Sequence, residues 1–199
     1  MRVLTNIVEH ARTALIRVLA PSSDFIRFQG LIRACELPGD CTREDFTEWW
    51  PRLSLKEREK WVVYEHKNTL TSAGRTQLLT YIASQNPVTG AFGQYFAVGA
   101  FQMNGVSPGD TAVQAEFYRT APSAAMIIGT QLDLSMYIGP NEANNLYFPG
   151  FYATNAGLYG LGATSVLGSG TLLTHSIFNY QRNAGVNQAI GIDYYINLM

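Results

Sequence analysis

The chain has 199 residues, and its 14 basic and 15 acidic side chains nearly balance. This length can bury a core without disulfides or metal, and the balanced charge does not indicate binding to nucleic acid or to an anionic membrane. No apolar run reaches the roughly 18 residues typical of a transmembrane helix, and charged residues interrupt the N-terminal pattern, which excludes a secretory signal. We therefore expect synthesis in the cytoplasm.

Helical patterns dominate the beginning of the chain. Asn6 followed by Glu9 resembles a capping box, and Pro21 ends the pattern that follows. The apolar residues of this first helix recur at helical spacing: Leu4, Val8, Ala11, Leu15 and Leu19. A second helix is expected over 25–35, where Phe28 and Ile32 share one side.

Two further helices are expected before residue 70. Thr42 caps a short one that ends near Pro51, and Ser54 with Glu57 forms a capping box that predicts a helix over 55–67. The tryptophans of this region are candidate interface residues: Trp49, Trp50 and Trp61. We therefore predict that residues 1–70 form a helical attachment or assembly segment.

Cys35 and Cys41 flank the turn Leu37–Asp40. We interpret them as two reduced thiols, with a disulfide across the turn as the alternative. A lone pair of cysteines is weak support for a metal site. No metal and no cofactor is expected.

From residue 71 onward the pattern changes to that of a β-domain. A short helix over 73–83 opens it, and Asn86-Pro87 ends that helix. Short apolar stretches separated by Gly, Pro and Asn then predict strands over 94–101, 117–120, 127–138, 146–154, 172–180 and 189–198. The predicted fold class is α+β: an N-terminal helical segment followed over 71–199 by an antiparallel β-sandwich, jelly-roll-like or immunoglobulin-like.

Charge is distributed unevenly between these two parts. Residues 1–75 contain 12 basic and 10 acidic side chains, whereas residues 76–199 contain only 7 charged residues. A soluble monomer normally solvates its surface with charge, so the second part is typical of a domain covered by neighbouring subunits. A neutral polar surface on a monomer is the alternative interpretation.

Several short sequence motifs after residue 70 occur in a characteristic order. They are Ala73-Gly74-Arg75 with Leu78-Leu79, Phe96-Ala97-Val98-Gly99, Pro108–Ala112 with Glu116 and Arg119, Glu142-Ala143-Asn144, Asn155–Gly160, Gly170–Leu173 with Phe178, and Ile196-Asn197-Leu198. Together they resemble a β-rich structural domain of tailed bacteriophages, over roughly residues 70–199. The resemblance implies a non-enzymatic virion component, located in the capsid shell as a decoration or cement subunit or in the tail or baseplate as an adaptor.

The candidate structural and interface residues of the β-domain lie within this resemblance: Glu116, Arg119, Asn155, Gly157 and Tyr159. Glu116 and Arg119 are the obvious charge pair in a charge-poor domain, and we expect them to clamp a strand or turn within the chain or, alternatively, to contact a neighbouring subunit. Gly109 and Gly157 are expected at positions of positive φ, with Pro108-Gly109 at the centre of a type II turn.

No enzymatic motif is found. The sequence contains no zinc-protease, P-loop or dinucleotide-binding motif. His175, Ser176 and Asp133 or Asp193 could be combined into a catalytic triad, but no nucleophile-elbow motif accompanies them. Aromatic residues between Tyr137 and Tyr159 could form a sugar platform, although core and interface packing is the commoner use of such residues. We therefore expect a protein that is not an enzyme.

These patterns together favour a capsid decoration or cement protein of a tailed-phage virion, assembled in the host cytoplasm. The expected partners are the major capsid protein, or tail proteins in the alternative, and further copies of the chain, with a trimer as one arrangement. A tail, neck, baseplate or fibre adaptor is the first alternative function. A carbohydrate-binding host-recognition module is the second.

Overall fold

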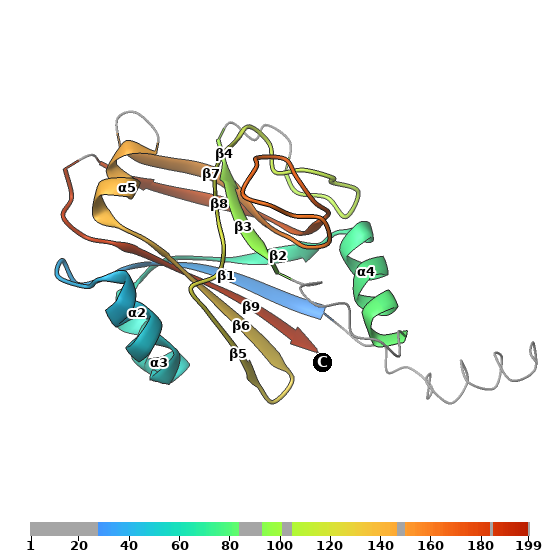
Figure 1. The fold of residues 1–199 in the computed structure, drawn as a ribbon, viewed down its shortest axis with the longest axis horizontal. Helices are drawn as coiled ribbons and strands as arrows, with labels where there is room; N and C mark the ends of the chain where they lie inside the picture. Colours follow the sequence, from blue (N-terminus) through green and yellow to red (C-terminus); the bar gives the residue numbers. More distant parts are fainter. Residues whose placement is uncertain (1–27, 84–92, 101–104, 147–149, 184, 199) are drawn as a thin grey trace, which may run out of the picture.

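The computed structural model describes residues 28–83, 93–100, 105–146, 150–183 and 185–198. These residues form nine antiparallel strands in one sheet of order β4-β3-β7-β8-β2-β1-β9-β6-β5, with short helices beside it (Figure 1). The strands are β1 (Phe28–Glu36), β2 (Val62–Leu70), β3 (Tyr95–Gly99), β4 (Glu116–Thr120), β5 (Ala124–Ile128), β6 (Gln131–Ile138), β7 (Phe151–Tyr159), β8 (Leu172–Arg182) and β9 (Ile190–Leu198). The helical segments are α2 (Arg43–Trp49), η1 (Trp50–Arg52), α3 (Leu55–Arg58), η2 (Glu59–Trp61), α4 (Ser72–Ala83) and α5 (Pro140–Asn145).

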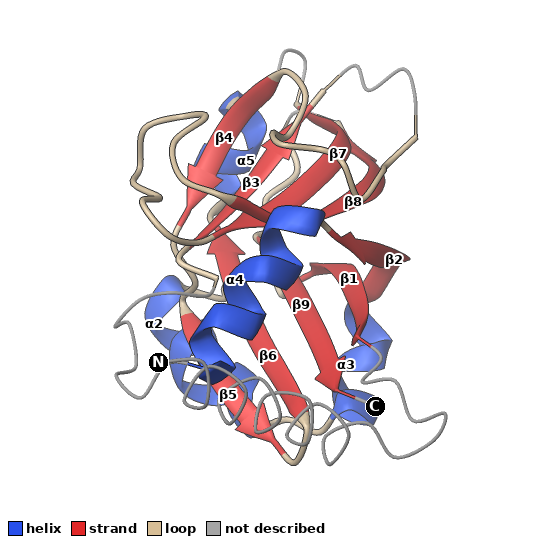
Figure 2. Ribbon diagram, turned by 90° about the vertical axis from the view of Figure 1, so that its right-hand side faces the viewer, coloured by secondary structure: helices blue, strands red, loops and turns tan. Residues whose placement is uncertain are grey.

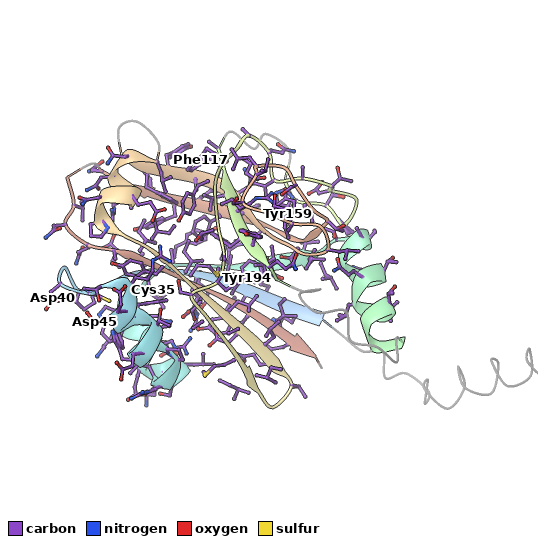
Figure 3. All side chains as sticks on the ribbon, viewed as in Figure 1. Cys35, Asp40, Asp45, Phe117, Tyr159 and Tyr194 are labelled. Carbon is purple, nitrogen blue, oxygen red and sulfur yellow. The ribbon has the colours of Figure 1, made fainter. Side chains whose placement is uncertain are left out.

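The sheet curls into a half-barrel, so that its two halves enclose one core. Strand β2 joins the halves: it pairs with β1 along most of its length and with β8 only at Thr69 and Leu70. Phe96 and Phe178 come from one half and Tyr194 from the other, and all three are fully buried. Figure 3 shows Tyr194 between the two halves. The fold is therefore predominantly antiparallel β, which the sequence predicted for residues 71–199 but not for the residues before them.

Alternation along β6 and β9 explains why these segments form strands. Leu134 and Met136 lie in the shared core, as do Ile192 and Tyr194 of the neighbouring strand. The residues between them, Asp133, Ser135 and Asp193, lie on the outer face and are also buried. A period of two places apolar residues on one face of a strand, and here the helical segments cover the other face.

The predicted helix over 25–35 is wrong, because residues from Phe28 onward form β1. The predicted helix over 55–67 is also wrong beyond its first turn: α3 and η2 end at Trp61, and β2 follows. A spacing of four residues, as between Phe28 and Ile32, is compatible with both a helix and a strand, so tertiary pairing decided the outcome. The expected helix over the first 20 residues lies outside the described residues.

Residues 28–70 are consequently not a separate helical unit. Strands β1 and β2 occupy the middle of the sheet, where β1 pairs with β9 and β2 pairs with β8. The expected boundary at residue 70 does not divide the described residues into two structural units. Helix α4, predicted over 73–83, is confirmed at Ser72–Ala83.

The later strands agree with the sequence prediction except in two places. The segment predicted as one strand over 127–138 is a hairpin, with β5 and β6 joined at Gly129 and Thr130. Gly129 has a φ of 60°, a conformation that tight hairpin turns require and glycine adopts readily. The strand predicted over 146–154 is shifted along the chain: α5 occupies Pro140–Asn145, and β7 runs from Phe151 to Tyr159.

The helical segments after β1 lie against the outer face of the sheet. Thr42 with Asp45 and Ser54 with Glu57 form capping boxes that begin α2 and α3. Phe46 and Trp50 are fully buried and share a small apolar cluster with Cys35 and Tyr137. Cys35 and Cys41 are free thiols, as the sequence interpretation favoured.

Candidate functional site

A glycine-rich loop over residues 160–171 connects β7 to β8, and an arginine holds it in place. Arg119 Nη1 donates to the carbonyl oxygens of Thr164 and Ser169, at 3.3 and 2.6 Å, and to Ser169 Oγ at 3.0 Å. Glu116 Oε2 accepts from the Gly168 amide at 3.0 Å. The loop is therefore anchored on β4 by two charged side chains.

Glu116 and Arg119 also bind each other. The Arg119 guanidinium donates to both carboxylate oxygens of Glu116, at 2.5 and 2.8 Å. Arg119 lies over the ring of Tyr159, with Cζ 4.0 Å from the ring centroid. Tyr159 is fully buried, and its hydroxyl accepts from the Val113 amide at 2.8 Å. The ion pair expected from the sequence is thus formed within the chain.

A β-bulge explains how two residues three apart on one strand meet. In the pairing of β3 with β4, Val98 faces Tyr118 and Gly99 faces Glu116, so Phe117 is the extra residue. An extra residue in one strand interrupts the alternation of its side chains. Glu116 therefore lies on the same face as Arg119.

The loop itself is closed by its own hydrogen bonds. The Gly160 amide donates to the Thr171 carbonyl at 2.9 Å, and the Thr171 amide donates to the Leu161 carbonyl at 3.1 Å. Gly170 has a φ of 81°, and a Cβ there would lie 2.5 Å from the backbone of Ala163. Glycine is required at this position both by conformation and by the close approach of the chain.

The apolar side chains of this ordered loop point outward. Leu161, Val166 and Leu167 are exposed by 56%, 67% and 50%. No charged residue occurs between Leu161 and Gly170. We name Leu161, Val166 and Leu167 the apolar loop face. Exposed aliphatic side chains on a loop whose backbone is held by hydrogen bonds are a candidate surface for contact with another molecule.

A second network fixes the loop that precedes β4. His175 of β8 is fully buried; its Nδ1 lies 2.6 Å from Asp110 Oδ2, and its Nε2 lies 3.0 Å from Asn155 Oδ1. The Asn155 amide also binds both backbone groups of Gln114, at 2.9 and 3.1 Å. Both nitrogens of the imidazole ring thus face oxygen atoms, and the network ties the loop to β7 and β8.

The two glycines expected at positive φ do not adopt it. The Asp110 amide donates to the Ser107 carbonyl at 3.1 Å, so Ser107–Asp110 form a turn, but Gly109 lacks the positive φ of a type II turn. Gly157 lies in β7, where a Cβ would meet the Thr174 carbonyl oxygen at 2.6 Å. The reason for glycine at residue 157 is therefore the close approach of β8.

A third network lies under the helical segments on the outer face of the sheet. Arg58 Nη1 is 2.7 Å from Asp133 Oδ2 and 3.3 Å from Asp193 Oδ1, and all three side chains are buried. Asp193 also accepts from Trp50 Nε1 at 2.7 Å and from Ser135 Oγ at 2.8 Å. The network attaches α3 and η1 to β6 and β9.

This third network contains two carboxyls and one guanidinium. Burial, followed by the nearby charge of Asp193, raises the pKa of the Asp133 carboxyl to about 6, although Arg58 opposes the change. Asp133 Oδ1 and Arg58 Nε have no hydrogen-bond partner in the described structure. Two carboxylates beside one guanidinium would leave a net negative charge in a buried site, which favours protonation of one carboxyl.

The three tryptophans predicted as interface residues differ in their exposure to solvent. Trp50 is fully buried, whereas Trp49 and Trp61 are half-buried and pack against it with ring centroids 5.3 and 5.7 Å away. These three rings fix the helical segments to their own sheet. Lys60 Nζ lies over the Trp61 ring, 3.8 Å from its centroid.

The residues weighed for catalysis belong to separate networks. His175 contacts Asp110 and Asn155, while Ser176 Oγ donates to the carbonyls of Lys67 and Ile177. Asp133 and Asp193 surround Arg58 instead. The hypothetical triad of these residues is therefore not assembled. The described residues contain no group of three His, Cys, Asp or Glu side chains placed to hold a metal ion.

Of the aromatic residues considered for a sugar platform, three are buried, one is exposed and two lie outside the described residues. Tyr137, Phe151 and Tyr159 are buried, and the Tyr137 hydroxyl donates to the Cys41 carbonyl at 2.7 Å. Tyr152 is exposed by 38%. Tyr147 and Phe148 lie outside the described residues.

Sequence reasoning identified Glu116, Arg119 and Asn155 but missed the roles of Arg58, Asp110 and the apolar loop face. One signal could have found the buried networks: all seven charged residues after Arg75 have a protein partner within the described structure. Charges that are rare in a neutral segment indicate internal pairing, because burial of an unpaired charge is costly. Nothing comparable in the sequence indicates that Leu161, Val166 and Leu167 point toward solvent.

No protein-family model matches this sequence. Comparison with curated proteins finds no significant match, and neither does comparison with solved structures. In the part of the chain that the structure describes, every helix is too short or too polar to cross a membrane.

Proposed function

We propose that this chain is a structural subunit of a tailed-phage particle and favour a role as a capsid decoration or cement protein. The observation that carries the proposal is the apolar loop face, whose backbone is held by Arg119 and Glu116 while its aliphatic side chains remain exposed. The phage resemblance of the sequence supports the same assignment. The expected jelly-roll-like or immunoglobulin-like sandwich belongs to this proposal, since two sheet halves around one core are compatible with it.

The physical argument concerns how such a loop binds. Full burial of a Val or Leu side chain contributes about 1.5–3 kcal/mol, so the three residues of the apolar loop face offer a useful binding energy. A loop that is already ordered loses little conformational entropy when it binds. The partner surface that fits is apolar and poor in charge, and we propose the major capsid protein as its source.

The test is made on particles that contain this chain. Val166→Lys places a charge at the most exposed position of the apolar loop face without touching the Arg119 contacts. We expect the variant protein to fold, to be lost from purified particles, and to leave those particles less resistant to heat and low salt. Leu79→Lys, on the exposed side of α4, is the matched control and should be retained.

The copy number in the particle separates the two locations. A number that matches the lattice of the shell supports the cement role, and a small number restricted to the vertex, neck or baseplate supports the adaptor role. The proposed role of the apolar loop face is wrong if Val166→Lys is retained in particles at the level of the unaltered protein and particle stability is unchanged.

A further inference from the structure

Strand β5 forms one end of the sheet. It pairs with β6, and the sheet order places no other described strand beside it. Figure 1 shows the β5–β6 hairpin projecting from the rest of the molecule, and Figure 2 shows β5 at the border of its half of the sheet. An edge strand presents unpaired backbone N–H and C=O groups along its free side.

The sequence of β5 lacks the usual means of blocking such an edge. Ala124–Ile128 contains neither a charged residue nor a proline, and these are the residues by which proteins commonly prevent edge-to-edge pairing. Ile127 is exposed by 80% and Ile128 by 51%. Within the described residues, the strand therefore offers backbone groups that no neighbouring strand pairs with, together with apolar side chains.

The exposed side chains extend the core face of the sheet. Ala125 pairs with Leu134 and Ile127 pairs with Leu132, so these four side chains lie on one face. Leu134 belongs to the main core, and Leu132 packs against it. The apolar face of the half-barrel thus continues to its open edge, where Ile127 is left uncovered.

The chain just before β5 is held by α2 and by β6. Arg43 of α2 donates to Ser123 Oγ at 3.3 Å and to the Tyr137 carbonyl at 3.2 Å. The Ser123 amide donates to the Ser135 carbonyl at 2.8 Å. Among the described residues, the candidate pairing edge is the side of β5 that faces away from β6.

Strand β4, at the opposite edge of the sheet, is less exposed than β5. The residues of β4 are all buried or half-buried, and Glu116 and Arg119 are used to hold the 160–171 loop. A head-to-tail contact between β5 and the β4 edge of another copy would meet this occupied region. The open β5 edge is better matched by an equally open one.

We infer that β5 pairs antiparallel with β5 of a second copy of this chain, which continues the sheet across a twofold axis. A twofold contact places the same patch on both sides. Because β5 is neutral, this self-pairing brings no like charges together, and it covers Ile127 and Ile128 of both copies. The inference goes beyond the proposed docking of the apolar loop face and uses a different surface.

The size of the contact sets the expected strength. Stable interfaces usually bury about 1,200 Å² or more in total, and one pair of five-residue strands with its side chains falls short of that. We therefore expect a weak, concentration-dependent dimer of the isolated full chain. High local concentration in an assembled particle would favour it.

Sedimentation analysis of the full chain over a wide concentration range tests the inference. We expect reversible dimerisation, and Ile127→Lys should weaken it by at least about tenfold, because it brings two lysines into one small contact. Val166→Lys should dimerise like the unaltered chain, which separates this surface from the apolar loop face. Circular dichroism establishes that each variant is folded, and Ile127→Thr replaces Ile127→Lys if the latter is not.

Cross-linking locates the contact. Single cysteines introduced at Ala125 or Ile127, tested separately and mixed, should form an interchain disulfide under mild oxidation, since the native Cys35 and Cys41 are buried. A chain that stays monomeric at every concentration overturns the inference. So does a dimer that Ile127→Lys leaves unchanged and that none of these cysteines cross-links.

Discussion

Glu116 and Arg119 are three residues apart on β4, and their side chains meet on one face because the bulge at Phe117 shifts the pairing with β3. In a regular strand this spacing would place them on opposite faces. The bulge therefore converts a local sequence feature into an anchor for a loop that begins more than 40 residues later. The exposure of Val166 and Leu167 depends on that anchor.

Replacement of Arg119 by Ala should loosen the 160–171 loop and destabilise the protein. Removing one partner of a buried ion pair costs about 3–5 kcal/mol, because the other charge is left unpaired. Urea denaturation measures the loss, and hydrogen exchange of the amides at residues 164–169 should accelerate. Arg52→Ala, which removes an exposed pair with Glu48, should cost less than about 1 kcal/mol; equal losses in the two variants would contradict the anchoring role.

Replacement of His175 by Leu should release the loop that precedes β4. The change removes the two hydrogen bonds of the ring, while Asp110 keeps the Ser107 amide and Asn155 keeps Gln114 as partners. At about 0.5–1.5 kcal/mol for each bond, we expect a loss of about 1–3 kcal/mol. We expect a lower melting temperature and faster proteolysis within residues 107–114. His66→Leu is the control, because His66 is only half-buried and its Nδ1 contacts the neighbouring Lys67 carbonyl; a control as sensitive as His175→Leu would argue against a specific clamp.

The Asp133 carboxyl should make the folded protein more stable in mild acid. Its pKa is raised to about 6 in the folded chain, against about 3.9 for an unperturbed Asp. The stabilisation from protonation is complete below the unfolded pKa and is lost as the pH rises through about 6. The slope from this one group is at most about 1.4 kcal/mol per pH unit.

Urea denaturation at several pH values between 4 and 7 measures this effect as the difference between the unaltered chain and Asp133→Asn. Carboxyls outside the Arg58 network titrate alike in both proteins and cancel in the difference. We expect the difference in unfolding free energy to change across this range in the direction that favours the unaltered chain at low pH. A constant difference would mean that Asp133 does not titrate there.

Deletion of residues 1–70 should abolish folding. Strands β1 and β2 lie in the middle of the sheet, and their loss would expose the edges of β8 and β9 and the core residues Tyr194 and Phe178. We expect an insoluble or unfolded product without cooperative thermal unfolding. A cooperatively folded fragment would support the separate β-domain that the sequence suggested.

Most of the β-rich fold after residue 90 could be predicted from the residue pattern alone. Short runs with a period of two, such as those of β6 and β9, coincide with strands because alternation and strand geometry share that period. The capping boxes at Thr42 and Ser54 could also be predicted, because each depends on two residues only three positions apart.

The remaining features depend on contacts between distant parts of the chain. Residues 28–36 carry a spacing that suits a helix or a strand, and pairing with Asn68, Leu198 and their neighbours made them a strand. Local sequence cannot specify a hydrogen-bond ladder whose partner lies far along the chain. For the same reason it indicated that Arg119 was paired, but not that its guanidinium would hold the loop that turns Leu161, Val166 and Leu167 outward.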